Sequence, residues 1–423
     1  MTLRSQLILI MLACCIVPMG IVSWIVDGRT DSMTSKTVET CGKHLDEQLR
    51  DALTHIRESY QEVVTNKLES IGSEVSNFAV NPSVQRALFD FKEAVRALRR
   101  EPDADGSQKR ALQQFYASFA AAADKQGATT IAPHTWLAKL DPTGEALQQR
   151  YIAQNPHPLG EKHRFDGPSP QLDAYDAAHA NFHPYARKLL ETFGYYDVFL
   201  VEPDEGRVVY TTFKEVDFGV RLNDGLLSDS GLSEAFRKAS AAAHGAVVMT
   251  DYRGYAPSYG KPAAFVASPI HDDGKLAGVA IFQFSIETIS KLLAPTTEDM
   301  SEETILIGSD GLMRSDSHLA PTTHSVVASW RNPETSKIDN AATQAMFGKH
   351  ETGYGSFTDQ RGKEVLASWA PISVFGLTWG IDDDVDDPCD LGPALCLPRL
   401  LPGNALGPPH PQPGDQPEIG RRR

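Results

Sequence analysis

Apolar residues recur at three- and four-residue steps from Val38 to Phe78. This spacing places them on one side of a helix and is close to a heptad repeat, the pattern of a helical seam. As one helix, the stretch would run about 60 Å at about 1.5 Å per residue. Two interpretations are open: a stalk that carries a signal and forms a homodimer through this N-terminal helix, or a helix that packs on its own domain.

Further helical patterns follow as far as Phe193. Asn81-Pro82 interrupts the first helix, because the residue before a proline is driven out of the helical region. We expect helices over about 83–100, 108–125 and 172–193, with Pro184 as a kink or a start in the last. The stretch 127–170 is irregular in pattern, apart from a short helix near 144–153.

From Tyr195 the pattern becomes that of strands. Two β-rich runs, 196–201 and 207–211, flank the turn Pro203–Gly206 and predict a hairpin. Strands are expected over 247–252, 263–269 and 277–284, and helices over 232–243 and 285–293. A second set follows, with a hairpin of 304–308 and 312–315 and strands over 355–358, 364–371 and 377–381. Antiparallel strands with helices on one side predict an α+β fold with two lobes.

The segment Leu7–Val26 contains no charged residue. At about 1.5 Å per residue it spans roughly 30 Å, the thickness of a hydrocarbon core. Arg4 precedes it and favours a cytoplasmic N-terminus, and Trp24 stands where an interfacial aromatic is expected. We predict a transmembrane anchor; the alternative is a cleaved signal peptide, or a lipoprotein signal around Cys14 or Cys15. The anchor and the cleaved signal both place the remaining chain outside the cytoplasm.

Charge and cysteine content narrow the function classes. The formal net charge of −15 argues against nucleic acid as a partner, and against broad adsorption to anionic lipid headgroups. All five cysteines lie outside residues 42–388. The folded body therefore has no disulfide framework and no thiolate metal site, and its core alone must stabilise it.

The sequence changes character after Ile381. Asp382–Asp387 leads into a proline-rich tail that ends in Arg421-Arg422-Arg423. We expect the tail to be disordered. It is either a true extension or, the interpretation we favour, an out-of-frame continuation of a truncated gene.

Four stretches resemble the extracellular double-Cache sensor regions of bacterial methyl-accepting chemotaxis proteins, and related regions of receptor histidine kinases and nucleotide cyclases. They are Phe193–Val201, Val209–Gly219, Tyr255–Gly260 and Gly311–Ser317. The resemblance implies two PAS-like lobes along a long N-terminal helix, with the first lobe far from the membrane. It also implies a second membrane helix and an output domain, for which the tail carries no pattern.

The expected organisation therefore has five parts. Residues 1–27 form a cytoplasmic stub and the transmembrane helix, and residues 28–194 form the helical stalk and a helical region. Residues 195–294 form the membrane-distal Cache lobe, residues 295–385 form the membrane-proximal lobe, and residues 386–423 form the disordered tail.

Aromatic and acidic residues are dense between two predicted strands of the first lobe. Asp251, Tyr252, Tyr255, Ser258 and Tyr259 lie where a loop would cover a PAS-like pocket. Aromatic walls with a few polar groups are typical of small-molecule sites, and a carboxylate suits the ammonium of an amino acid or an amine. The alternative is a surface loop with packed aromatics.

Three more candidates lie at the end of the first hairpin or just beyond it. Lys214 and Asp217 line the same cavity in the binding interpretation, and form an exposed pair in the alternative. Tyr210 points either into the cavity or away from it.

Two other groupings offer weaker evidence of chemistry. Arg314 and Asp316 form either an equivalent site in the second lobe or, as we favour, a turn network beside the second hairpin. His179 and His183 have a spacing that can chelate zinc, but Ala180 stands where the metalloprotease pattern needs a glutamate. We predict no metal, no cofactor and no catalytic residue.

Together these patterns predict a single-pass receptor of the bacterial inner membrane that senses a small solute outside the cytoplasm, for signal transduction or chemotaxis. The ligand classes considered are amino acids, amines and organic acids. The alternatives are the sensor half of a receptor histidine kinase or nucleotide cyclase, and an anchored binding protein that works alone.

A fusion test checks the predicted topology. Alkaline phosphatase fused after Asp31 should be active, because the enzyme folds only in the periplasm, whereas a fusion after Arg4 should be inactive. Activity of a cytoplasmic reporter fused at Asp31 would contradict the topology.

Overall fold

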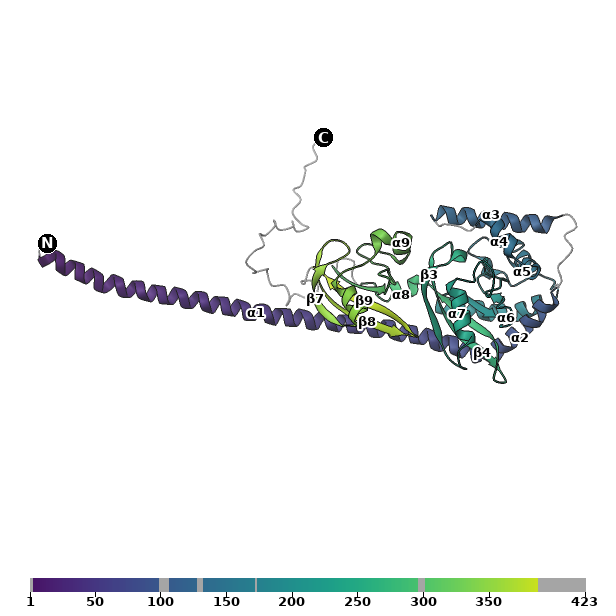
Figure 1. The fold of residues 1–423 in the computed structure, drawn as a ribbon, viewed down its shortest axis with the longest axis horizontal. Coiled ribbons are helices and arrows are strands. Elements are labelled where there is room, and N and C mark those ends of the chain that lie inside the picture. The colour runs from purple at the N-terminus through teal and green to yellow at the C-terminus, as the bar shows by residue number, and fades with distance from the viewer. Residues whose placement is uncertain (1–2, 99–105, 128–131, 172, 296–300, 387–423) are drawn as a thin grey trace, which may run out of the picture. The chain divides into compact units, whose positions relative to one another are not determined.

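The computed structural model describes residues 3–98, 106–127, 132–171, 173–295 and 301–386, with side chains from residue 39 onward. Residues 50–386 form one compact unit, which contains both sheets and the site. The first helix, α1, is Leu3–Val80 (Figure 1). The side chains of the predicted anchor Leu7–Val26, and the whole predicted tail from residue 387, lie outside the described residues. Within the described residues, no helix combines the length and the apolar character that a membrane crossing requires.

The predicted helical pattern of α1 is confirmed, and from Val64 onward its apolar residues belong to the core of the unit 50–386. Arg57 of α1 also donates from Nε to Ser368 Oγ of the second sheet at 3.1 Å. Cys41, farther toward the N-terminus on the same seam, is exposed. Homodimerisation through this helix stays a prediction. The buried seam residues are Leu49, Leu53, Val64, Leu68, Ile71, Val75 and Phe78.

Along the chain, several helices follow α1 before the first strand begins. Asn81 caps α2 (Pro82–Ala97), as the Asn81-Pro82 break predicts. Helices α3 (Ser107–Lys125) and α6 (Ala174–Phe193) also match the prediction, and Pro184 lies inside α6. The stretch predicted as irregular holds α4 (Pro133–Lys139), α5 (Pro142–Gln148), the π-helical turn η1 (Gln149–Ala153) and the 3₁₀ turn η2 (Lys162–Arg164).

The first lobe is an antiparallel sheet with strand order β2-β1-β5-β4-β3. Its strands are β1 (Tyr195–Val201), β2 (Val208–Thr211), β3 (Val248–Gly254), β4 (Pro262–Asp272) and β5 (Lys275–Phe284). The predicted hairpin is β1 with β2, and the helix between β2 and β3 is α7 (Gly231–Ser240). After β5 comes the short helix α8 (Ile286–Ser290).

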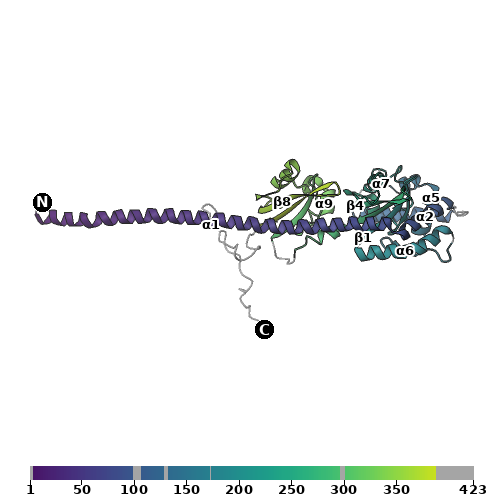
Figure 2. The ribbon, with the colours of Figure 1, turned by 90° about the horizontal axis from the view of Figure 1, so that it is seen from below.

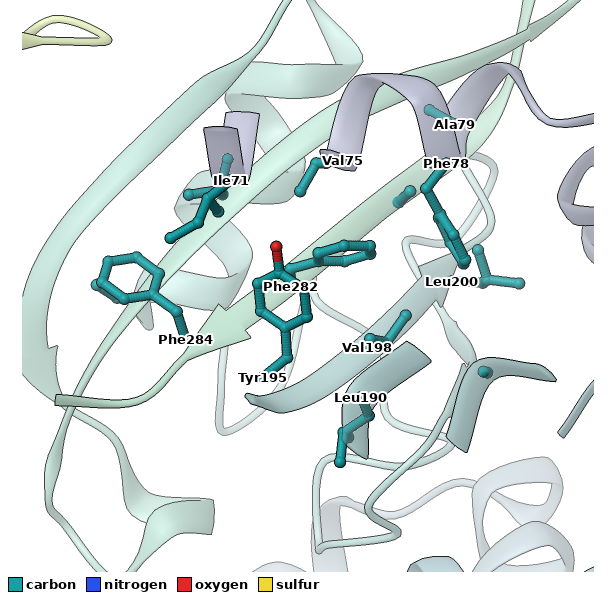
Figure 3. Packing of buried hydrophobic residues seen from close by; sticks show 14 of the residues in the cluster. Ile71, Val75, Phe78, Ala79, Leu190, Tyr195, Val198, Leu200, Phe282 and Phe284 are labelled. Atoms are coloured by element: carbon teal, nitrogen blue, oxygen red, sulfur yellow. The ribbon is translucent and has the colours of Figure 1, made fainter. Parts of the chain in front are cut away.

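The two faces of this sheet have different partners. Val198 and Phe282 pack with Val75 and Phe78 of α1 (Figure 3). Phe199, next along β1, turns to the other face and packs with residues of α7. Successive residues of a strand point to opposite faces, so α1 and α7 lie on opposite sides of the sheet.

The second lobe is an antiparallel sheet with strand order β6-β9-β8-β7. Its strands are β6 (Glu302–Gly308), β7 (Gly353–Thr358), β8 (Glu364–Val374) and β9 (Leu377–Val385). Between β6 and β7 lie α9 (Val326–Arg331), α10 (Pro333–Ser336), α11 (Ala341–Gln344) and the π-helical turn η4 (Ala345–Lys349). Apolar residues of β6, β8 and β9 join the α1 core, so α1 lies beside both sheets (Figure 2). The α+β fold is confirmed.

The predicted strand 312–315 is wrong. Residues 309–315 pair with β6 only through one isolated bridge, between Ile307 and Met313. The Leu306 N–H donates to the Ser315 hydroxyl at 2.8 Å. A side chain thus takes the place of a ladder carbonyl, and the segment continues as a turn.

Strand β9 extends to Val385, through the aspartates that follow the predicted strand 377–381. Asp382, Asp383 and Asp384 are fully buried. Within the described part of the chain, neither oxygen of Asp382 has a hydrogen-bond partner, and Oδ2 is unpartnered in both Asp383 and Asp384. Burial, then the neighbouring carboxylates, raises the pKa of Asp382 well above its usual value, and burial raises that of Asp384 to about 8.

These aspartates make stability depend on pH. A carboxyl with a raised pKa in the folded state contributes stability that is complete below its unfolded pKa of about 4 and is lost as the pH rises toward its folded-state pKa, which for Asp384 is about 8. Asp382→Asn should therefore raise the melting temperature more at pH 8 than at pH 5, by a few degrees at about 2–4 °C per kcal/mol. Scanning calorimetry measures the two differences.

The matched control is Asp273→Asn, at an exposed turn position of the β4–β5 hairpin. It should change the melting temperature equally at both pH values. An equal effect of Asp382→Asn at the two pH values would contradict the protonated burial of this side chain.

Candidate functional site

Four ionisable side chains are buried where β1 meets the segment after β2. Asp197 lies in β1, and Lys214, Glu215 and Asp217 follow β2. None is more than 9 % exposed, and their charges influence one another. We call these four residues the charged cluster.

The Asp197 carboxylate shapes the turn that carries the other three. Its Oδ1 accepts hydrogen bonds from the backbone N–H groups of Val198 at 2.6 Å, and of Thr212 and Phe213 at 2.9 Å. Its Oδ2 accepts from the Thr211 hydroxyl. Burial raises the pKa of Asp197 to about 6 although these donors lower it. Both oxygens are therefore engaged by the fold itself.

Lys214 is fully buried with its ammonium among aromatic rings. Its Nζ lies 4.5 Å from the ring centroid of Tyr210, 5.2 Å from that of Phe218 and 5.9 Å from that of Tyr151. It donates to the Thr211 carbonyl, and within the described residues no ion pair to it is found. Burial lowers the pKa of Lys214 to about 7 against the attraction of nearby carboxylates.

Asp217 and Glu215 each have one engaged oxygen and one free one. The Tyr255 hydroxyl donates to Asp217 Oδ2 at 2.7 Å, and the Tyr196 hydroxyl donates to Glu215 Oε1 at 2.9 Å. Asp217 Oδ1 and Glu215 Oε2 are buried with no partner in the described part of the chain. Burial, then the charge of a neighbouring aspartate, raises the pKa of Asp217 to about 8 and that of Glu215 well above its usual range.

A small, partly open hollow adjoins the charged cluster. Lys162 of η2 lines it, with its ammonium 5.7 Å from the Phe115 ring and hydrogen-bonded to the carbonyls of His157 at 3.0 Å and Asn155 at 3.4 Å. Burial lowers the pKa of Lys162 to about 8. The lining residues are Phe115, Phe119, Leu159, Gly160, Lys162, Phe213, Lys214, Glu215 and Tyr259.

This lining joins aromatic rings with two ammonium groups and a carboxylate. Neither lysine has a carboxylate partner in the described residues, and Glu215 keeps a free oxygen. The hollow can therefore offer hydrogen-bond donors from the lysines and an acceptor from Glu215 to a small molecule, while the rings of Phe119 and Tyr259, stacked at 5.1 Å, form an apolar wall.

The structure brings six of the eight predicted site residues into this region. Lys214 and Tyr259 line the hollow, Tyr255 holds Asp217, and Tyr210 lies under the Lys214 ammonium. The sixth, Ser258, is buried and accepts a hydrogen bond from Gln283 Nε2 at 3.2 Å. The alternative of an exposed Lys214–Asp217 pair is wrong, because both side chains are buried.

Asp251 and Tyr252 are not in this region, which corrects the predicted grouping. The Asp251 carboxylate is paired with Arg314 of the second lobe at 2.8 Å. The Tyr252 ring stacks on Trp379 of β9, with centroids 6.1 Å apart. Both residues lie in an irregularity of β3, between Thr250 and Arg253, where the strand leaves register with β4.

Several lining residues were not identified from the sequence. Glu215 stands beside Lys214, so its position was a usable signal. Phe115 and Phe119 of α3, and Lys162 of η2, reach the hollow from a helical region far away in the sequence. Only the tertiary fold brings these segments to the sheet.

The remaining candidates form structural contacts. Asp316 Oδ1 accepts from the Val326 N–H at 2.7 Å, which is the turn network we favoured. His179 and His183 are buried and stacked at 4.3 Å, and burial lowers the pKa of both rings well below the usual value. Within the described residues, no three His, Cys, Asp or Glu side chains are placed to hold a metal ion.

No family model matches the chain, and no curated protein matches it. Among solved structures it is similar to the ligand-binding domain of the Pseudomonas aeruginosa PAO1 amino acid chemoreceptor PctC in complex with GABA: 17 % identity over 45 % of this chain and 74 % of that chain, TM-score 0.31. It is also similar to the ligand-binding domain of the Pseudomonas fluorescens chemoreceptor CtaA in complex with L-serine. The identity is 15 % over 50 % of this chain and 79 % of that chain, with a TM-score of 0.31. A third similar structure is Methyl-accepting Chemotaxis protein X. The identity is 13 % over 48 % of this chain and 80 % of that chain, with a TM-score of 0.35. At such TM-scores the likeness carries no argument.

The Tyr255–Asp217 hydrogen bond can be tested by substitution. Tyr255→Phe should destabilise the protein by about 1–3 kcal/mol, because it leaves Asp217 buried without a donor. Urea denaturation measures the loss. Tyr259→Phe is the matched control, since its half-buried hydroxyl has no hydrogen bond to another described residue. Equal stability of the two variants would contradict the assignment.

Proposed function

We propose that this chain is a membrane-anchored, extracytoplasmic sensor of the double-Cache type, and that the hollow of the first lobe binds its small-molecule ligand. The observation that carries the proposal is the free Glu215 oxygen in a hollow that two lysines without carboxylate partners also line. Buried polar atoms in folded proteins almost always have partners. A bound solute would supply the missing ones.

The lining favours a zwitterion of the amino acid class. A ligand ammonium would be accepted by Glu215, and a ligand carboxylate would be met by Lys162 and Lys214. An amine alone would leave the lysines without an anionic partner, and an organic acid alone would leave Glu215 without a donor.

The proposal includes anchoring through Leu7–Val26 and a homodimer formed through α1. The uncharged anchor segment and the seam that continues to the exposed Cys41 support these two parts. The sensor half of a receptor histidine kinase or nucleotide cyclase, and an anchored binding protein, would use the same hollow. These alternatives differ in output and not in the ligand site.

A ligand screen with matched variants tests the hollow. The purified protein is screened by thermal shift against the twenty L-amino acids, amines and organic acids, and calorimetry measures the affinity of each compound that raises the melting temperature. Glu215→Gln and Lys162→Met should each weaken binding about 10- to 150-fold, because each removes one charged hydrogen-bond partner.

Lys261→Met is the control, because Lys261 is exposed on the nearby β3–β4 loop. It should leave the affinity unchanged. Unaltered binding in both Glu215→Gln and Lys162→Met would place the ligand elsewhere, and a screen without any binder would reject the proposed ligand classes.

A further inference from the structure

One carboxylate of the first lobe accepts three hydrogen bonds from the second lobe. Arg314 donates from Nε to Asp251 Oδ1 and from Nη2 to Asp251 Oδ2, both at 2.8 Å. Trp379 of β9 donates from Nε1 to Asp251 Oδ1 at 3.0 Å. We call this group of three residues the clasp. Paired donors on a guanidinium fix the direction of approach as well as the distance.

In the second lobe, the Arg314 side chain of the clasp is buried and hydrogen-bonded through each of its guanidinium nitrogens. Arg314 is only 2 % exposed, and its remaining donors reach the Leu312 carbonyl at 2.9 Å and Asp310 Oδ2 at 3.0 Å. A Cβ on Gly308 would lie 2.1 Å from Arg314 Nη2, so the guanidinium occupies space that only glycine leaves open. Arg314 is therefore held by its own lobe through close packing on Gly308 and two further hydrogen bonds.

In the first lobe, the Asp251 side chain of the clasp is less constrained than Arg314. Asp251 and Tyr252 lie where two residues of β3 oppose one residue of β4, a bulge in the ladder. The backbone here makes fewer ladder bonds than a regular strand and can shift without breaking the rest of β3. The Asp251 side chain is also 26 % exposed, against 2 % for Arg314.

The same segment leads directly into the candidate site. Tyr255, whose hydroxyl holds Asp217, is four residues beyond Asp251, and Tyr259, which lines the hollow, follows it. At about 3.3 Å per residue, Tyr255 lies within roughly 13 Å of Asp251 along the strand. A change in the position of Tyr255 would therefore displace Asp251 relative to the fixed Arg314.

We propose that the clasp couples the two lobes. A ligand in the first-lobe hollow would change the position of Asp251 and, through the clasp, the stability of strands β6 and β9 in the second lobe. This inference rests on the proposed function for its biological meaning. Its physical content is energetic coupling between Tyr255 and strands β6 and β9 by way of Asp251. Two sites are coupled only if a change at one alters the free energy of the other.

The test perturbs the site by mutation and therefore needs no ligand. Amide hydrogen exchange is measured over β6 and β9 in the wild-type protein, in Tyr255→Phe, in Asp251→Asn and in the double variant. Only amides that exchange by local opening are compared, because global unfolding would report the general loss of stability. Tyr255→Phe should change exchange in these strands about 2- to 30-fold, the range of typical coupling energies. In the Asp251→Asn background, the same substitution should have no further effect.

Two matched variants complete the design. Lys261→Met, on the same loop but exposed, should not change exchange in β6 or β9. Trp379→Phe removes one donor from Asp251 and keeps an aromatic ring against Tyr252; it replaces Asp251→Asn if that variant does not fold. Circular dichroism establishes that each variant is folded.

The outcomes separate cleanly. An effect of Tyr255→Phe that disappears when the clasp is broken supports the proposal. An equal effect with and without the clasp, or no effect in β6 and β9 in either background, overturns it. A failed ligand screen would reject the proposed function and leave this exchange result unaffected.

Discussion

The apolar seam of α1 is the constraint on which the rest of this fold depends. Residues of α1 from Val64 to Phe78 belong to one continuous core with Val198 and Phe282 of the first sheet and Leu306 and Ile381 of the second. One helix thus provides the apolar partner for one face of each sheet. Since strand residues alternate, the neighbours of these apolar residues along each strand point to the opposite face of the sheet.

This division explains where the unusual carboxylates lie. In β1, Asp197 alternates with Val198, which packs toward α1, and therefore points to the other face. In β9, Asp382 alternates with Ile381 in the same way and pairs with Ile305 of β6. Asp197 and Asp382 thus each lie on the sheet face away from the shared helix.

The sequence predicted the elements that depend on local patterns. The seam of α1, the β1–β2 hairpin and most later strands follow from spacing and turn residues. What it did not predict depends on distant segments: Lys214 is buried by rings from η1 and the loop after β2, although its charge suggested an exposed position. The segment 312–315 has strand residues, but the Ser315 hydroxyl takes the bond that a ladder carbonyl would have taken. Asp251 has the residue type of a ligand contact, and only its partner Arg314 reveals its role.

The buried charges of this protein fall into two groups by how completely they are paired. Both Asp251 oxygens accept strong donors, and Arg314 meets two carboxylates and a carbonyl. Such saturated groups fix the geometry, because losing one partner leaves a buried charge uncompensated, at a cost of about 3–5 kcal/mol. Glu215 and Asp382 instead keep free oxygens, so something outside the chain's own hydrogen bonds must compensate them. For Glu215, which lines a hollow, a solute can do so; for Asp382, enclosed in a central strand among other carboxylates, a proton can. The saturated pairs thus hold the two lobes together, and the unsaturated ones mark where the protein responds to its surroundings.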